Sequence, residues 1–230
     1  MEDEKIHLFL RIFEFLFYHL CRTSTLFANR FYFPCPVENR ELVPRDTPCI
    51  LAPAGHRSYL DIFLVSVLTQ RKLRYIGKRS LWDHPVGGWL LSRLGGFPME
   101  RNGPDLKSMR KCIDILTGGE SLVIFPEGGR RSGPEVYPIF DGAAYLSIRT
   151  GVPIIPVGIW GAEAAMGRGA SFPRARRMHM IVGEPLYPPK TDRAERVPRD
   201  AMRDMTERLQ DRLQCLFKEA RLKATHSRLC

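Results

Sequence analysis

Residues 49–61 read CILAPAGHRSYLD, an apolar run that ends in a glycine turn and leads into a helix-like stretch near residues 59–70. The same alternation of a short apolar run with a helix-like stretch continues toward the C-terminus. It predicts an α/β domain with a mostly parallel sheet flanked by helices. The other expected strands are 73–77, 121–125, 154–158 and 178–182, and the other expected helices lie near 85–94, 105–117, 141–149 and 200–223.

The composition is that of a folded, basic protein. The 230 residues are 44% hydrophobic and 26% charged, which excludes a mainly disordered, collagen-like or coiled-coil chain. The formal net charge of +10 indicates a negatively charged partner: nucleic acid, an anionic membrane surface or a phosphorylated substrate. The six cysteines form no C-x-x-C pair and no zinc-finger spacing, so we expect reduced thiols and no metal.

An apolar stretch at residues 6–21, IHLFLRIFEFLFYHLC, predicts an N-terminal helix. Its polar members share one narrow helical stripe: His7, Arg11, Glu14 and Tyr18. The stretch is too short and too charged for a transmembrane span, which needs roughly 20 apolar residues. We therefore expect a helix lying in the membrane interface, with the polar stripe toward the headgroups. The alternative is a helix packed on the protein's own core.

A second aromatic cluster at residues 27–33 follows this helix and ends at Pro34. We therefore divide the chain into a membrane-associating helical segment, residues 1–36, and the main α/β domain, residues 37–230. The expected location is the cytoplasmic face of the cell membrane, with peripheral or monotopic attachment.

The first motif that could carry chemistry is Gly55-His56-Arg57-Ser58-Tyr59-Leu60-Asp61, at a strand-to-helix junction. A carboxylate five residues after the histidine can accept a hydrogen bond from one ring nitrogen, which fixes the tautomer. The other ring nitrogen can then act as a base toward a hydroxyl group. The alternative is a histidine that only caps the helix.

Further motifs follow other predicted strands and helices. In Pro126-Glu127-Gly128-Gly129-Arg130-Arg131-Ser132, the glycines permit close backbone approach and an arginine can bind a phosphate. In Gly95-Gly96-Phe97-Pro98-Met99-Glu100-Arg101, the glycines suit a turn after the 85–94 helix, and Arg101 is another candidate for phosphate. Lys78 ends the second strand. The alternative for the first of these motifs is a surface turn with solvated arginines, and for the second a helix cap followed by a surface arginine.

These motifs, with Val152-Pro153-Ile154-Ile155-Pro156, resemble the four motif blocks of the glycerolipid acyltransferases, in their order and approximate spacing. The resemblance is to the 1-acylglycerol-3-phosphate acyltransferase type and spans about residues 45–190. Three positions depart from the usual pattern: Gly55 stands where Asn is frequent, Gly129 where Thr is usual, and Pro98 where Ile is usual.

The resemblance implies transfer of a fatty acyl group from acyl-CoA or acyl carrier protein to a lysophospholipid acceptor, 1-acylglycerol-3-phosphate, giving phosphatidic acid without a metal or cofactor. His56 matches the general base and Asp61 its orienting carboxylate. The remaining matched positions belong to the region that binds the acceptor phosphate: Lys78, Arg101, Glu127, Gly128 and Arg130.

Three other interpretations remain. The acceptor could be glycerol-3-phosphate, dihydroxyacetone phosphate or a lipid without phosphate, or the protein could be an inactive peripheral lipid-binding protein. Nucleic-acid binding through Arg174, Arg176 and Arg177 is not expected, because that cluster has no recognised module or interleaved aromatics. We expect it to face anionic lipid headgroups instead. The sequence does not define the oligomeric state.

Overall fold

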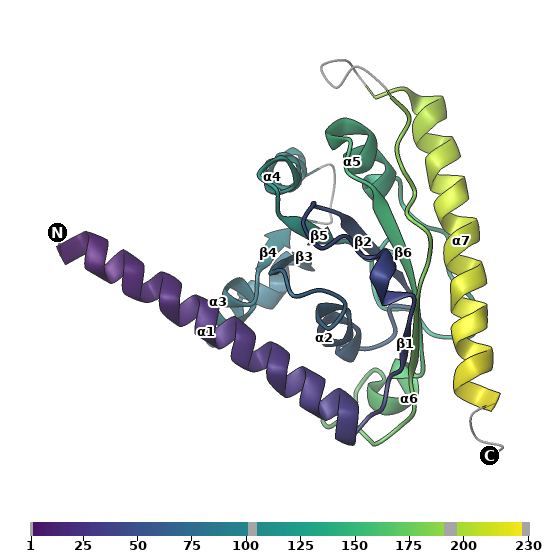
Figure 1. Cartoon of the computed structure of the whole chain (residues 1–230), viewed down its shortest axis with the longest axis horizontal. Helices are drawn as coiled ribbons and strands as arrows, with labels where there is room; N and C mark the ends of the chain where they lie inside the picture. The colour runs from purple at the N-terminus through teal and green to yellow at the C-terminus, as the bar shows by residue number, and fades with distance from the viewer. Residues whose placement is uncertain (1, 101–104, 191–196, 227–230) are drawn as a thin grey trace.

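The computed structural model describes residues 2–100, 105–190 and 197–226, which fold around one seven-stranded sheet (Figure 1). The strands lie in the order β1-β7-β6-β2-β5-β3-β4. Every neighbouring pair is parallel except β6 and β7, which confirms the predicted mostly parallel α/β architecture. The bounds are β1 Val37–Glu38, β2 Ile50–Ala54, β3 Leu73–Lys78, β4 Gly96–Met99, β5 Ser121–Val123, β6 Ile154–Trp160 and β7 His179–Val182.

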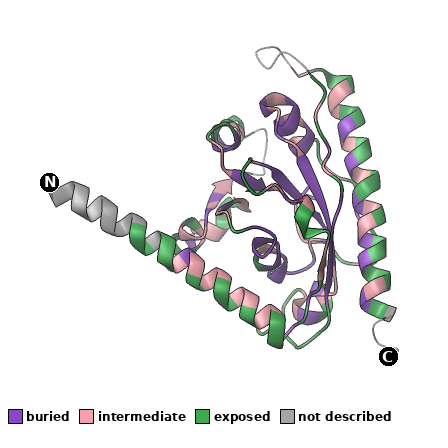
Figure 2. Cartoon of the chain, viewed as in Figure 1, coloured by how far each residue is buried: buried purple, intermediate pink, exposed green. Residues whose placement is uncertain are grey.

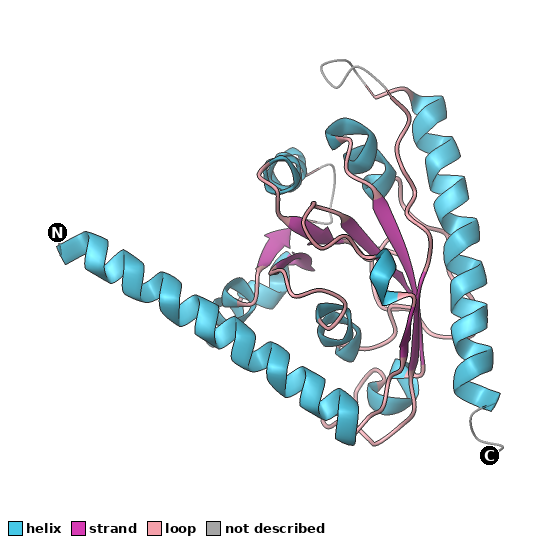
Figure 3. Cartoon of the chain, in the orientation of Figure 1, coloured by secondary structure: helices cyan, strands magenta, loops and turns pink. Residues whose placement is uncertain are grey.

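The central strands are buried on both faces because helices cover the sheet on each side (Figures 2 and 3). In β2 the side chains alternate between two cores: Leu51 belongs to one, and Ile50 and Ala52 belong to the other. The near-continuous apolar runs of the sequence reflect this double burial. The helices are α1 Glu2–Phe31, α2 Leu60–Ser66, α3 Pro85–Arg93, α4 Leu106–Thr117, α5 Gly142–Thr150, α6 Ala162–Met166 and α7 Arg199–His226, with short 3₁₀ turns at Arg40–Leu42 and Arg79–Trp82.

Helix α7 crosses the sheet at unusually close range. A Cβ atom at Gly158 in β6 would lie 2.5 Å from the backbone carbonyl group of Leu216 in α7. Only glycine leaves room for that approach. The periodicity of the sequence predicts an apolar face on this helix made of Met202, Met205, Leu209, Leu213, Leu216 and Ala220. In the structure Met205, Leu209 and Leu213 enter the core on that side of the sheet, and the largest side chain that α7 buries there is Phe217, which the pattern does not include, whereas Leu216 is only partly buried.

The N-terminal segment is one continuous helix, α1, rather than a helix over 6–21 followed by a separate aromatic cluster. The polar stretch after Cys21 does not end it, and within that stretch the Thr25 hydroxyl donates a hydrogen bond to the Cys21 carbonyl oxygen at 2.9 Å. The helix ends at Phe31, shortly before Pro34, which is where a proline is expected to stop it.

The structure corrects the predicted orientation of α1. Tyr18 was expected to face lipid headgroups, but it is buried, and its hydroxyl accepts a hydrogen bond from the Leu73 N–H at 3.2 Å. At 100° per residue, most of the exposed apolar side chains of α1 lie on the opposite side of the helix from Tyr18. These are Ile12, Phe13, Leu16, Leu20, Phe27 and Phe31. Phe13 also contacts the Trp89 ring of α3, with centroids 6.4 Å apart, and Phe15 is exposed on the Tyr18 side of the helix. The side chains of His7, Arg11 and Glu14 lie outside the described part of the structure.

The residues after helix α3 form a strand where the sequence predicted only a turn. Gly95 has a φ of 90° and makes the turn, and β4 then pairs with β3 along its whole length. Pro98 is compatible with this strand because β4 is at the edge of the sheet, where a missing N–H breaks no ladder. Within the described ranges, no helix has an apolar stretch long enough to cross a bilayer.

Candidate active site

The candidate site lies at the carboxyl ends of three neighbouring strands, β2, β5 and β3. His56 follows β2, the stretch from Pro126 to Arg130 follows β5, and Lys78 ends β3. In parallel sheets these ends meet at one edge, which is where ligands usually bind. The topology therefore places most of the expected site residues on the same edge. Arg101 lies outside the described residues.

The turn that presents His56 depends on Gly55. Its φ is 79°, in the left-handed region, and a Cβ at this position would lie 2.2 Å from the Phe217 ring and 2.7 Å from the Ile159 carbonyl oxygen. An asparagine could adopt the backbone angle but would collide with α7. The close packing of the Phe217 ring over this turn therefore requires glycine at position 55.

His56 and Asp61 form a hydrogen-bonded pair. Nδ1 of His56 lies 3.1 Å from Oδ2 of Asp61, whose side chain is fully buried in the first turn of α2. The same oxygen accepts hydrogen bonds from the backbone N–H groups of Arg57 and Ser58, both at 2.8 Å. The His56 ring also stacks on Phe125, with centroids 3.9 Å apart. Because Nδ1 is occupied by the carboxylate, Nε2 is the nitrogen left for another molecule.

The Glu127 side chain lies beneath this turn, and its hydrogen bonds go to groups of the protein itself. Its Oε1 accepts hydrogen bonds from the N–H groups of Gly55 (2.9 Å) and His56 (3.3 Å). Its Oε2 accepts from the Arg57 guanidinium and from the Tyr137 N–H, both at 3.1 Å. The side chain is buried and fully used by the protein. Glu127 is expected from the sequence to belong to the region that binds the acceptor phosphate; in the structure its carboxylate accepts hydrogen bonds from the backbone that carries His56.

Arg57 is the site residue that sequence reasoning missed. It is buried, pairs with Glu127 and donates a second hydrogen bond to the Glu135 carbonyl oxygen at 2.6 Å. Its guanidinium also lies over the rings of Phe217 and Tyr137, at 5.3 and 5.7 Å from their centroids. An arginine in a glycine-containing turn is usually solvated, and no signal in the sequence distinguishes this one.

The cations beside the pair differ in their surroundings. Lys78 is exposed at the end of β3. The Arg130 guanidinium lies 3.8 Å from the centroid of the Tyr59 ring, a cation–π contact with a residue between His56 and Asp61. Gly128 makes a tight turn with a φ of 70°, and its N–H donates to the Phe125 carbonyl oxygen at 3.0 Å, so this amide is already used.

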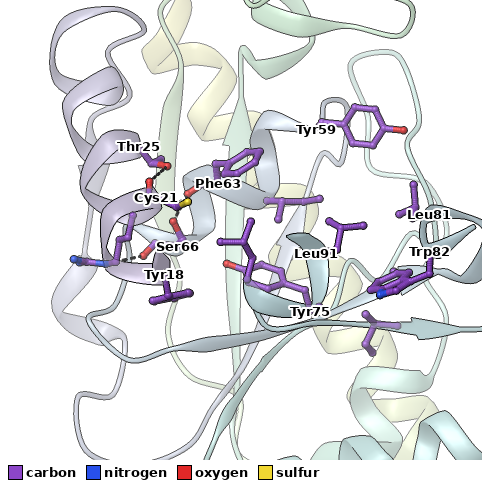
Figure 4. A pocket seen from close by; sticks show the side chains of 16 residues that line it. Tyr18, Cys21, Thr25, Tyr59, Phe63, Ser66, Tyr75, Leu81, Trp82 and Leu91 are labelled. Atoms are coloured by element: carbon purple, nitrogen blue, oxygen red, sulfur yellow. Dashed lines mark hydrogen bonds between the residues drawn. The ribbon is translucent and has the colours of Figure 1, made fainter. Parts of the chain in front are cut away.

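An apolar cavity of about 280 Å³ adjoins the site between α1, α2, β3 and the segment of residues 81–96 (Figure 4). Tyr59 lines it, so the cavity reaches the turn that carries His56 and Asp61. The hydroxyl groups of Thr25 and Ser66 do not make its wall polar, because they donate to backbone carbonyls at 2.9 and 2.6 Å. Burial raises the pKa of the Tyr75 hydroxyl well above its ordinary value. The other lining residues include Tyr18, Cys21, Ile62, Phe63, Ile76, Leu81, Trp82, Leu91 and Leu94.

Replacing Glu127 by Gln should destabilise the protein, because it leaves the buried Arg57 guanidinium without a carboxylate. We expect the free energy of unfolding, measured by urea denaturation, to fall by about 3 kcal/mol. Glu135→Gln is the matched control, since the Glu135 side chain is exposed and only its backbone carbonyl contacts Arg57. A loss for Glu127→Gln as small as that of a surface substitution, below about 0.5 kcal/mol, would contradict the proposed role.

Comparison with known proteins confirms the predicted family. The Acyltransferase family matches residues 35–160, more than half of the chain. A 1-acyl-sn-glycerol-3-phosphate acyltransferase of Bacillus subtilis is 28% identical over 178 residues, which cover 77% of this chain and 85% of that protein. The chloroplastic enzyme BAT2 of Brassica napus, also a 1-acyl-sn-glycerol-3-phosphate acyltransferase, is 29% identical over 165 residues, covering 70% of this chain and 47% of the plant protein. The chain thus spans about half the length of the plant relatives that it matches.

The fold is shared with a solved structure. The crystal structure of the 1-acyl-sn-glycerophosphate acyltransferase PlsC from Thermotoga maritima superposes with a TM-score of 0.68 and 22% identity, covering 85% of this chain and 77% of that one. The matched family region contains the His56–Asp61 pair and the Pro126–Arg130 turn at the same edge of the sheet. This chain therefore belongs to the Acyltransferase family.

Proposed function

We propose that this protein transfers an acyl group from a thioester to the free hydroxyl of 1-acylglycerol-3-phosphate and so forms phosphatidic acid. The observation that carries the proposal is the His56–Asp61 pair, held at 3.1 Å at the strand edge where ligands bind. The relatives from Bacillus subtilis and Brassica napus bear the name of this activity. The thiol carrier of the donor is coenzyme A or acyl carrier protein.

In the proposed reaction His56 acts as the general base. Asp61 accepts the Nδ1–H hydrogen bond, so the neutral ring presents the lone pair of Nε2 to the acceptor hydroxyl. Nε2 takes the hydroxyl proton while the oxygen attacks the thioester carbonyl carbon. The C–S bond then breaks, the departing thiolate receives the proton from the imidazolium, and an ester replaces the thioester. This direct transfer needs no acyl-enzyme and no metal.

The acceptor phosphate would bind to the cations at the same edge. Lys78 ends β3 and Arg130 lies in the turn after β5, at the sheet edge where His56 also lies, and Arg101 is a third candidate by its position in the sequence. The ring of Tyr59 holds the Arg130 guanidinium without neutralising its charge. A phosphate bound there would bring the acceptor hydroxyl to His56, which is catalysis by positioning.

The apolar cavity is suited to an acyl chain. Its walls are almost free of polar groups that could bind a soluble ligand, and it adjoins the catalytic turn at Tyr59. An acyl chain in this space would stay out of water while its ester or thioester end lies beside His56. The protein would meet such lipids at a membrane surface, where the exposed apolar stripe of α1 would lie in the acyl boundary with the rest of the domain outside it.

The function is tested directly by product analysis. Purified protein is incubated with acyl-CoA or acyl-carrier-protein donors and with 1-acylglycerol-3-phosphate, glycerol-3-phosphate or 1-acylglycerol, and the products are identified by mass spectrometry. We expect phosphatidic acid, and His56→Ala should lower kcat by about 10²- to 10⁴-fold without loss of the fold. His84→Ala, a change at an exposed helix cap, is the control. Product from another acceptor alone, or no product at all, would favour the alternatives.

Arg130→Ala should raise the KM for the phosphorylated acceptor by about ten- to a hundredfold, the value of one charge-assisted hydrogen bond, and leave the KM for the donor nearly unchanged. Tyr59→Leu removes the ring beneath the guanidinium and should raise the same KM by about two- to fivefold. Tyr59→Phe keeps the ring and is the matched control. Equal effects on donor and acceptor would place Arg130 at the phosphates of the donor.

Substituting serine for Leu16, Leu20 and Phe27 together should release the protein from lipid vesicles. These side chains are exposed and lie opposite the buried Tyr18, so the fold is expected to persist. A buried Leu or Phe side chain is worth about 1.5–3 kcal/mol, so even partial insertion of three predicts at least a tenfold weaker partition. Leu222→Ser, at an exposed position of α7, is the control. Sedimentation of the triple variant equal to that of the parent would show that α1 is not the attachment.

A further inference from the structure

The segment between α6 and β7, residues 167–177, is an exposed loop whose most prominent side chain is Phe172. Phe172 is 82% exposed, the largest exposed fraction among the large hydrophobic side chains of the described residues. A single exposed apolar residue needs no explanation, but Phe172 stands in a loop whose charged residues are all arginines. The loop reads GRGASFPRARR and carries four arginines. No acidic residue occurs between Glu163 and Glu184.

The loop is held by hydrogen bonds to its own end and to the neighbouring helix. The Arg174 N–H donates to the Ala165 carbonyl oxygen in α6 at 2.8 Å, and the Ala170 N–H donates to the Gly167 carbonyl oxygen at 3.2 Å. These contacts fix the ends of the loop while Phe172 remains exposed. The prominence of Phe172 is therefore built into the folded structure.

The loop is also attached to the end of α1. The Tyr32 hydroxyl donates to the Pro173 carbonyl oxygen at 3.1 Å, and the Met178 N–H donates to the Pro34 carbonyl oxygen at 3.0 Å. Figure 1 shows the segment that follows α6 beside the C-terminal end of α1. The exposed apolar stripe of α1 ends there with Phe31, which is 67% exposed. The loop that carries Phe172 is thus attached beside the end of α1 where Phe31 is exposed.

We propose that residues 167–177 form a second membrane contact, in which Phe172 enters the headgroup region and the arginines bind anionic lipid. The inference rests on the proposed attachment through α1 and adds a partner of defined charge to it. An exposed aromatic ring among arginines suits the boundary of an anionic bilayer, where the ring leaves water and each cation gains from the surface potential. Contact at two points would also fix the rotation of the protein about the axis of α1.

Phe172 changes the interpretation of the arginine cluster that follows it in the sequence. The arginines at 174, 176 and 177 were expected to face anionic lipid, and the absence of interleaved aromatics argued against nucleic acid. The structure shows that Phe172, two residues before Arg174, is part of the same exposed surface. A bilayer accounts for both the exposed ring of Phe172 and the positive charge of the arginines. Nucleic-acid binding would depend mainly on the positive charge. A duplex oligonucleotide is therefore the competing ligand in the test below.

The test uses the full chain and sedimentation with two kinds of vesicle, phosphatidylcholine alone and phosphatidylcholine with added phosphatidylglycerol. Phe172→Ala should weaken binding to both kinds by about tenfold. Phe172→Trp should retain binding, because tryptophan favours the membrane interface. The double variant Arg174→Ala/Arg176→Ala should lose about tenfold or more in affinity for the anionic vesicles only. Tyr187→Ala and Arg212→Ala, exposed residues outside this loop, are the controls.

The outcomes separate this inference from the proposals on which it rests. If the triple substitution in α1 releases the protein but Phe172→Ala behaves like Tyr187→Ala, attachment through α1 stands and the second contact is wrong. If the arginine variant loses affinity for a duplex oligonucleotide and not for anionic vesicles, the loop binds nucleic acid and the inference is also wrong. If the parent protein binds neither vesicle, both contacts are wrong, while acyl transfer to a detergent-dispersed acceptor still tests the catalytic proposal.

Discussion

One buried carboxylate, that of Glu127, joins the two turns from which the candidate active site is built. It accepts hydrogen bonds from two successive N–H groups of the turn after β2 and from the Arg57 guanidinium on the same turn, although it belongs itself to the turn after β5. A buried charge is tolerated only when it is paired and fully hydrogen-bonded. The position of the His56 backbone is therefore tied to the position of the Pro126–Arg130 turn, and neither turn can shift without leaving charged atoms unpaired.

The same constraint explains how two carboxylates in one small region serve different purposes. Glu127 is saturated by protein donors and has no capacity left for a substrate. Oδ2 of Asp61 is hydrogen-bonded to Nδ1 of the His56 ring and accepts hydrogen bonds from two backbone N–H groups. Its Oδ1 has no hydrogen-bond partner among the described residues. The first carboxylate orders the backbone and the second orders a ring. Both are needed before the cations at the strand edge can present a phosphate to His56 in the proposed reaction.

The sequence predicts this fold well wherever strands are buried on both faces, since continuous apolar runs then mark them. It fails for β1, which has only two residues, and for β4, which contains Pro98 and is tolerable only at a sheet edge. Local motifs predict His56, Asp61 and Arg130 as site residues because ligands usually bind at the carboxyl ends of parallel strands, and the structure places all three at that edge. They do not reveal Arg57 or the role of Glu127, since burial of a charge depends on residues far along the chain. Likewise, Tyr18 belongs to a stripe that is polar by composition, but its hydroxyl accepts a hydrogen bond from the Leu73 N–H and so faces the domain.

The contact between Gly55 and Phe217 has a consequence for the order in which the protein is made. The ring that closes over the turn carrying His56 belongs to α7, more than 160 residues after His56 in the chain. During synthesis the N-terminal part emerges first, at about 5–20 residues per second. At this rate Phe217 is added about 8 to 32 seconds after His56, and until α7 has left the ribosome the ring does not cover the apolar side of the turn or the Arg57 guanidinium. Over that interval the nascent chain holds the complete set of predicted catalytic side chains but not the surface that fixes them.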